Sequence, residues 1–208
     1  MLSWEVRAIN IAVFISGRGS NLQSIIDAAG GELPVQPVLV ISDNQEAFGL
    51  QRAEKAGIEA KFVDPASFPS QKDYEQKLIK LLAERAVELV ALAGFMRLLS
   101  SYFLENFPGR VMNIHPSLLP SFRGLHAQKQ AVDYGVKVSG CTVHFVDEGM
   151  DTGPIILQEA VPVYDDDDAD SLAARILEKE HEIYPRAIKL YAEGRLEQKG
   201  RRVYRKGT

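Results

Sequence analysis

The amino-acid sequence predicts an α/β fold, a Rossmann-like, mostly parallel twisted sheet with helices on both faces and an antiparallel extension near the C-terminus. In the first half of the chain, short apolar runs alternate with segments of helical periodicity, which is the pattern of β-α-β units. A glycine-rich turn joins the first apolar run to the first helical segment. In the second half, two β-rich runs follow one another without a helix between them, which indicates antiparallel pairing.

Strands and helices are expected to alternate through the first half of the chain. Strands are predicted at residues 9–16, 37–42, 60–63 and 89–93, and helices at 21–29, 49–56 and 73–86. Because crossovers between parallel strands are right-handed, these units form a parallel sheet that is covered on both faces. Ligands of such sheets bind at the carboxyl ends of the strands, near a switch in strand order.

The second half is expected to add a short strand, a helix, the antiparallel extension and a long helix. These elements are predicted at residues 111–114, 126–134, 139–146 with 155–163, and 169–192. Pro185 lies inside the long helix and should kink it. The basic tail, 195–208, is expected to form a short hairpin with a frayed end.

Length, composition and charge indicate one ordinary globular domain. The chain has 208 residues, of which 46% are hydrophobic and 25% are charged. Because the sequence contains neither a repeat nor an interdomain linker, we expect a single domain over 1–208, with 1–8 as an N-terminal extension and 195–208 as a C-terminal tail. The net charge of -4 argues against nucleic acid or an anionic membrane as the main partner.

Cys141 is the only cysteine, so an intrachain disulfide and a thiolate metal cluster are both excluded, and a cytoplasmic location is expected. The apolar run at residues 9–15 contains Asn10 and ends in a glycine turn. It is too short to span a membrane and lacks the small-residue pattern of a cleaved signal peptide. This run therefore predicts a buried strand.

The turn from Ser16 to Asn21 contains two glycines and precedes the first predicted helix. Free backbone N–H groups and the helix dipole attract an anion at such a place, so the turn is either a phosphate site or a plain connection. Ser20 and Asn21 also suit simple helix caps. The dinucleotide-binding fingerprint fails because Leu22 occupies its third glycine position, which weakens the alternative of a dehydrogenase.

Asn113 and His115 lie two positions apart at the end of a predicted strand, so both side chains should point to the same side. An amide can donate to an oxygen that gains charge, and an imidazole can transfer a proton near neutral pH; together they suit an acyl-type transfer. Asp151, in the acidic turn at 147–154, is the candidate carboxylate to hold the imidazole and favour its charged form. The alternative for this turn is a solvated loop without a catalytic role.

Two further features are expected to have structural roles and no catalytic or metal-binding role. His144 falls within a predicted buried strand and is expected to be a structural residue. The acidic run at 165–168, with Asp170, lacks the spaced oxygen ligands and the glycine of a calcium loop. We expect this run to be a solvated turn that caps the long helix, and we expect no metal site.

Five segments together carry a resemblance to a known family. They are residues 16–23, 92–99, 113–120, 144–154 and 180–181. On these segments the chain resembles the monofunctional phosphoribosylglycinamide formyltransferases, which use 10-formyltetrahydrofolate in purine biosynthesis. The sequence Gly-Leu-His-Ala at 124–127 resembles the glycinamide branch. We expect neither the additional carboxyl-terminal domain of methionyl-tRNA formyltransferases nor the amino-terminal regulatory domain of formyltetrahydrofolate deformylases.

On the acceptor side, the resemblance implies that Gly19, Ser20 and Asn21 hold the substrate phosphate. Glu180 would form a hydrogen bond with the ribose or glycinamide part of the same substrate. The implied reaction transfers the formyl group of 10-formyltetrahydrofolate to the amine of N1-(5-phospho-D-ribosyl)glycinamide.

On the folate side, the resemblance implies a pterin pocket in which backbone groups read the heterocycle. The residues assigned to this pocket are Met96, Arg97, Leu98, Leu99 and Asn113. The family often has Arg or Lys at the position of Gln71, where the side chain meets the folate tail. Lys72, next to it, is the alternative for that contact.

The resemblance also assigns catalysis to Asn113, His115 and Asp151, with the folate as co-substrate and without a metal. The implied partners are small molecules, and the enzyme is expected to be a monomer or a homodimer. Two alternatives remain open: a formyltransferase that acts on another small amine acceptor, and a phosphoribosyl-binding module without catalysis. The second alternative leaves the three catalytic candidates unexplained.

Overall fold

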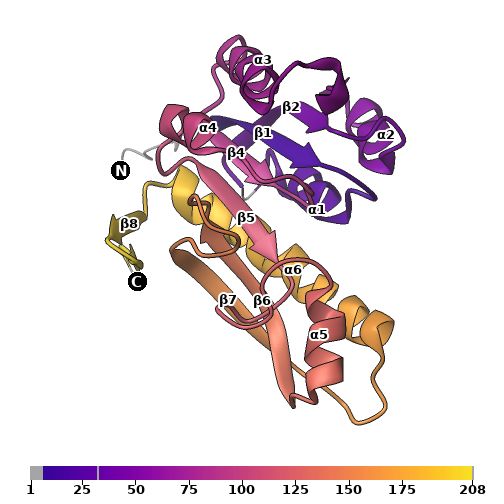
Figure 1. Ribbon diagram of the computed structural model, residues 1–208. Coiled ribbons are helices and arrows are strands. Elements are labelled where there is room, and N and C mark those ends of the chain that lie inside the picture. Colours follow the sequence, from indigo (N-terminus) through magenta and orange to yellow (C-terminus); the bar gives the residue numbers. More distant parts are fainter. Residues whose placement is uncertain (1–6, 32, 208) are drawn as a thin grey trace.

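The computed structural model describes residues 7–31 and 33–207, which form one nine-stranded sheet with helices on both faces (Figure 1). In sheet order, the strands are β3 (Glu59–Phe62), β2 (Val35–Ser42), β1 (Ile9–Ile15), β4 (Leu89–Leu92), β5 (Val111–His115), β6 (Val138–Phe145), β7 (Ile155–Pro162), β9 (Arg202–Arg205) and β8 (Leu196–Lys199). The strands from β3 to β5 are parallel, whereas β6 and β7 are antiparallel additions. The predicted fold class is thus confirmed.

Most of the helices were predicted from periodicity. The helices are α1 (Ser20–Ala28), α2 (Phe48–Lys55), α3 (Gln71–Ala83), α4 (Ser101–Asn106), α5 (Ala127–Tyr134) and α6 (Ala169–Ala192), and a 3-10 helix, η1, spans Pro65–Ser67. The sequence did not predict α4 or η1, because neither is long enough to show a full apolar period. Helix α6 continues through Pro185 to its predicted end.

The boundaries of α3 show how local chemistry sets a helix end. The sequence predicted a start at residue 73, but the helix begins earlier because the Ser70 hydroxyl accepts a hydrogen bond from the Asp73 N–H (3.2 Å). The predicted end at residue 86 was too late. Ala86 has φ 48°, which lies outside the helical region, so the chain leaves the helix before it.

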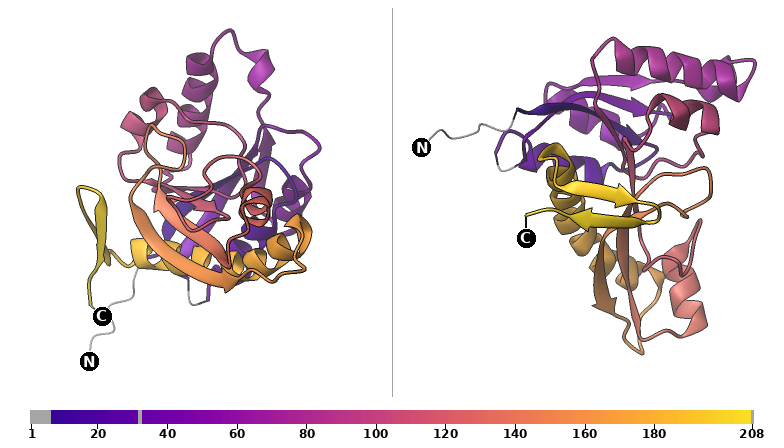
Figure 2. Two further views of the ribbon diagram at one scale, coloured as in Figure 1. Left: turned by 60° about the horizontal axis from the view of Figure 1, so that its bottom comes forward. Right: turned by 90° about the vertical axis from the view of Figure 1, so that its left-hand side faces the viewer.

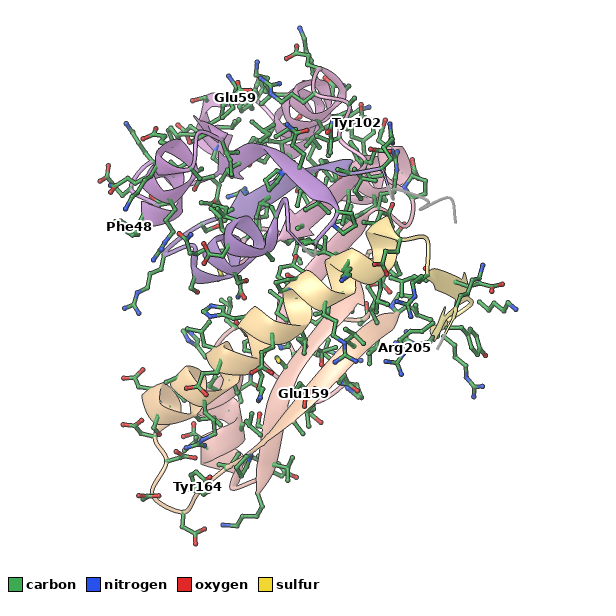
Figure 3. All side chains as sticks on the ribbon, turned by 180° about the vertical axis from the view of Figure 1, so that it is seen from behind. Phe48, Glu59, Tyr102, Glu159, Tyr164 and Arg205 are labelled. Atoms are coloured by element: carbon green, nitrogen blue, oxygen red, sulfur yellow. The ribbon has the colours of Figure 1, made fainter. Side chains whose placement is uncertain are left out.

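The core consists of two layers, one on each face of the sheet. In β1, Ile11, Val13 and Ile15 face α1 and α6, whereas Ala12 and Phe14 face α3 and α4. This alternation follows the period of two along a strand. Figure 3, which views the molecule from behind, shows α6 lying across the strands of the C-terminal half.

The C-terminal tail forms the predicted hairpin from β8 and β9, which stands away from the main body (Figure 2). Strand β9 pairs with the main sheet at one parallel bridge, between Ile155 and Arg202, and its Val203 packs against the core. The frayed end predicted for Thr208 and most of the predicted extension, 1–8, lie outside the described residues. Within the described part of the chain, every helix is too short or too polar to cross a membrane.

Candidate active site

The carboxyl ends of β1, β4 and β5 meet at one edge of the sheet. The Ser16 N–H donates to the Gly94 carbonyl (3.1 Å), and the Met96 N–H donates to the Ser16 hydroxyl (2.9 Å). Strand β5 is the parallel neighbour of β4, so its last residue, His115, reaches the same edge. The three segments that the sequence placed at strand ends therefore converge.

A cavity opens beside the glycine-rich turn and is lined by residues 16–21, by residues that follow β4, and by Leu177 and Glu180 of α6. Gly19 has φ 69° and occupies the N-cap position of α1, where no side chain caps the helix. Ser20 is the first helical residue, so Ser20 and Asn21 do not act as its caps. The first-turn N–H groups of α1 are left for a ligand at the cavity.

Glu180 and Asn21 connect α6 to α1 at this cavity. Asn21 Nδ2 donates to Glu180 Oε2 at 2.8 Å, although the two residues lie 159 positions apart in the sequence. Glu180 is only 6% exposed, and burial raises the pKa of its carboxyl to about 7, against the opposite effect of the Asn21 hydrogen bond. Two residues assigned to the acceptor are thus in contact, and one of them changes charge near neutral pH.

His115 lies between two acceptors. Its Nδ1 is 3.4 Å from Asp151 Oδ2, and its Nε2 is 2.8 Å from the Phe122 carbonyl oxygen. The residue is only 5% exposed. Both neighbours of the ring, a carboxylate and a backbone carbonyl, can only accept hydrogen bonds from it.

Asp151 is held in place by its own loop and by a neighbouring one. Its backbone has φ 53°, in the left-handed region, and its Oδ2 accepts a hydrogen bond from the Gly124 N–H (2.8 Å). Within the same turn, the Thr152 hydroxyl donates to Asp147 Oδ1 (2.5 Å). The side chain of Asp151 is mostly buried, so the alternative of a solvated acidic loop does not describe this residue.

The structure also brings His144 into this group, a contact that the sequence did not predict. His144 Nε2 lies 3.2 Å from Asn113 Nδ2 and 3.8 Å from Asp151 Oδ1. Burial lowers the pKa of His144, which favours the neutral ring. Nδ1–H then donates to the Phe145 carbonyl (2.8 Å), and Nε2 accepts from the Asn113 amide.

His144 was missed because strand register is a long-range property. Asn113 on β5 is the direct cross-strand partner of His144 on β6. Side chains of directly opposed residues lie on the same face of a sheet, and their Cβ atoms are close. The available signal was a histidine within a predicted β-rich run. Neither the neighbour of that run in the sheet nor its register could be set from the sequence.

The residues assigned to folate lie on the loop that follows β4, on α3 and, in the case of Asn113, on β5. Met96 and Leu98 are 65% and 61% exposed, whereas the Leu99 side chain is buried in the core. The Arg97 guanidinium lies over the Tyr74 ring, 5.8 Å from its centroid. The loop therefore presents two apolar side chains at the surface.

Gln71 lies beside this loop. Its Nε2 donates to the Leu98 carbonyl (3.1 Å) and to Glu75 Oε1 (3.0 Å). Lys72 turns elsewhere, since its Nζ lies over the Tyr102 ring at 5.1 Å from the centroid. Of these two neighbours, Gln71 is the one in contact with the loop.

The acidic run before α6 is the predicted helix cap. Asp168 accepts hydrogen bonds from the N–H groups of Asp170 (3.0 Å) and Ser171 (2.8 Å), which forms a capping box with Ser171. Arg175 pairs with Asp167 at 2.7 Å. In residues 7–31 and 33–207, no group of three or more His, Cys, Asp or Glu side chains is arranged to hold a metal ion.

Comparison with protein families gives one match over most of the chain. Residues 9–188 match the family described as formyl transferase. The crystal structure of glycinamide ribonucleotide transformylase 1 from Symbiobacterium toebii is 52% identical in sequence, with a TM-score of 0.95. The alignment covers 99% of this chain and 97% of that structure.

Curated relatives include both short and long proteins. The phosphoribosylglycinamide formyltransferase of Escherichia coli is 46% identical over 189 residues, which cover 90% of this chain and 89% of the relative. The trifunctional purine biosynthetic protein adenosine-3 of Drosophila melanogaster is 50% identical over 191 residues. The present chain spans only 14% of the length of that larger protein.

Proposed function

This chain belongs to the formyl transferase family, and from that premise we propose that it is a phosphoribosylglycinamide formyltransferase. Its reaction transfers the formyl group of 10-formyltetrahydrofolate to the amine of N1-(5-phospho-D-ribosyl)glycinamide, a step of purine biosynthesis. A folate-type one-carbon donor follows from the family. The exact identities of the formyl donor and of the amine acceptor are what we propose.

One observation carries this proposal: an amide, an imidazole and a carboxylate meet at the strand edge that also carries the glycine-rich turn. Asp151 links the set, since its two oxygens face His115 (3.4 Å) and His144 (3.8 Å). His144 in turn contacts Asn113. A module that only binds phosphoribosyl groups has no use for this arrangement, whereas acyl transfer uses each group.

Asn113 is proposed as the donor to the oxyanion. When the acceptor amine attacks the formyl carbon, the formyl oxygen gains charge, and the bond from the formyl carbon to N10 of the folate then breaks. Asn113 Nδ2 carries two hydrogens, of which one is directed to His144. The other hydrogen is available for the tetrahedral intermediate.

His115 is proposed to act as an imidazolium that faces Asp151 and delivers a proton to the leaving N10. The attacking amine loses a proton, so the transfer is balanced without a metal or a covalent enzyme adduct. Nε2–H is directed to the Phe122 carbonyl (2.8 Å), so delivery from this atom requires that contact to open.

For the folate, we propose that the loop after β4 lines the pterin pocket. Met96 and Leu98 would contribute exposed side chains. Leu99 would contribute mainly backbone groups because its side chain is buried, and so would Arg97, whose guanidinium lies over the Tyr74 ring. Gln71 would meet the folate tail from α3, next to Leu98.

For the acceptor, we propose phosphate binding at Gly19, Ser20 and Asn21 and a hydrogen bond from the ribose or glycinamide part to Glu180. The support is the shared cavity and the contact between Asn21 and Glu180.

We further propose one formyltransferase domain over residues 1–208 that works in the cytoplasm as a monomer or homodimer, without a nucleic-acid or membrane partner. The net charge of -4 and the single cysteine support this view.

The test follows the absorbance change as 10-formyltetrahydrofolate loses its formyl group. Three parallel reactions contain glycinamide ribonucleotide, the unphosphorylated glycinamide riboside, or no acceptor. We expect turnover only with the phosphorylated acceptor. Equal turnover of the riboside would refute the phosphate assignment, and no turnover in any reaction by folded protein would refute the proposed reaction.

A further inference from the structure

Arg52 of α2 contacts the glycine-rich turn from outside the cavity. Its Nε donates to the Arg18 carbonyl (3.0 Å), and its Nη1 donates to Gln23 Oε1 (3.0 Å). Its guanidinium lies over the Phe48 ring, 4.9 Å from the centroid. Among the residues that the structure describes, no carboxylate forms a direct ion pair with Arg52; the nearest link to one runs through Gln23, whose Nε2 donates to Asp27 Oδ1 (2.8 Å).

Helix α2 holds the turn at a second point. The Gly49 N–H donates to the Gly17 carbonyl (3.1 Å). A Cβ added to Gly19 would lie 2.7 Å from Gly49 Cα, so the backbones of the turn and of α2 are in direct contact. Two successive carbonyls of the turn, those of Gly17 and Arg18, are thus directed toward α2.

The direction of these carbonyls sets the direction of the N–H groups that follow them. In a planar trans peptide the C=O and the N–H point in opposite directions. When Arg52 holds the Arg18 carbonyl toward α2, the Gly19 N–H of the same peptide points away from α2. Gly19 also lines the cavity, so its N–H is available to an anion bound there.

We propose that Arg52 is a positioning residue for the acceptor phosphate: by holding the Arg18 carbonyl it aims the Gly19 N–H at the phosphate, and it places an unpaired positive charge behind the turn. This inference rests on the proposed function, because it takes the phosphate to bind at Gly19, Ser20 and Asn21. Arg52 does not touch the substrate. Its effect is on acceptor binding and not on the chemical step.

Two substitutions separate the hydrogen bonds from the charge. Arg52→Gln removes the charge, whereas Arg52→Lys keeps it but replaces the planar fork by a single ammonium group. The control is Lys55→Gln, which removes the same charge from an exposed position in the last turn of the same helix. Thermal unfolding of all the variants shows whether each one is folded.

Binding is measured by calorimetry with ribose 5-phosphate as the probe and ribose as the control ligand, so the test does not depend on turnover. We expect ribose 5-phosphate to bind Arg52→Gln and Arg52→Lys roughly tenfold more weakly than the wild type or Lys55→Gln. In steady-state kinetics, KM for the phosphorylated acceptor should rise by a similar factor while kcat and KM for folate stay within about twofold.

The outcomes are distinct. Wild-type binding by folded Arg52→Gln and Arg52→Lys would overturn the proposal, and so would equal weakening in Lys55→Gln. Full binding by Arg52→Lys alone would overturn the positioning role and leave only a charge effect. A wild type that binds ribose 5-phosphate as expected but shows no formyl transfer would refute the proposed function while the role of Arg52 in phosphate binding stood.

Discussion

The proposed acceptor side and the proposed catalytic side of this site are built in different ways. The acceptor side uses the main chain of a turn between β1 and α1, where Gly19 approaches Gly49 closely and no side chain caps the helix. The catalytic side uses side chains from β5, β6 and the turn that carries Asp151. The acceptor side should therefore be sensitive to atoms added to the turn, and the catalytic side should be sensitive to the removal of side-chain groups.

The largest effect is expected on the catalytic side, at His115 and Asp151. His115→Ala and Asp151→Asn should each lower kcat by about 10²- to 10⁴-fold, because each removes part of the proton transfer. Phosphate binding, measured with ribose 5-phosphate, should be unchanged, since neither residue lines the acceptor cavity. The control is Asp133→Asn, an exposed carboxylate that pairs with Lys129. A kcat within a few-fold of wild type for His115→Ala would remove His115 from the mechanism.

The next effect is expected at Asn113. Asn113→Ala should lower kcat by about 10²- to 10³-fold, because it removes the donor to the oxyanion. Asn113→Asp, which keeps the shape but replaces the amide donor with a carboxylate, should be equally impaired. Single-turnover measurements with saturating substrates isolate the chemical step. Near-normal rates for both variants would assign the oxyanion to another donor.

On the acceptor side, one added methyl group tests the close approach of the turn to α2. Gly19→Ala should lower the free energy of unfolding by about 2–4 kcal/mol, from the positive φ and from the contact at 2.7 Å with Gly49 Cα. Gly30→Ala is the matched control, because Gly30 also has positive φ but has no atom within 4 Å of an added Cβ. It should cost only about 1–2 kcal/mol. Equal losses in urea unfolding would show that crowding at Gly19 is unimportant.

The last effect depends on pH and comes from the ionisation of Glu180, whose pKa is raised from 4.5 to about 7 by burial. Between these values the folded state binds more protons than the unfolded state, so this group lowers stability as pH rises. Its cost is absent below pH 4.5 and reaches about 3 kcal/mol above pH 7. Glu180→Gln should therefore stabilise the protein at pH 8 and leave its stability at pH 4 unchanged.

The same ionisation should affect binding in the opposite direction. If ionised Glu180 accepts a hydrogen bond from the acceptor, KM for the acceptor falls as pH rises through about 7. Urea unfolding and initial rates across this range measure the two effects. The control is Glu182→Gln, an exposed carboxylate on the same helix. A Glu180→Gln variant that keeps the wild-type pH dependence of KM would contradict the assignment.

The two parts of the site also differ in how far the sequence could reveal them. The glycine-rich turn is local, and its residues were identified together because they are adjacent in the chain. Asn113 and His115 were likewise read from one strand. The contact of Asn21 with Glu180 could be implied only by the family resemblance, because 159 positions separate the two residues. His144 was classified as structural although it contacts Asn113.

By itself, the sequence determined the alternation of strands and helices, the glycine-rich turn, the cap of α6 and the family. These features depend on apolar period, backbone freedom and hydrogen bonds between residues close in the chain. Only the tertiary structure decided that His144 joins Asn113, that Asp151 lies between two histidines, and that Arg52 holds the Arg18 carbonyl. These contacts depend on strand register and on the packing of helices against the sheet, which are set by the whole chain at once.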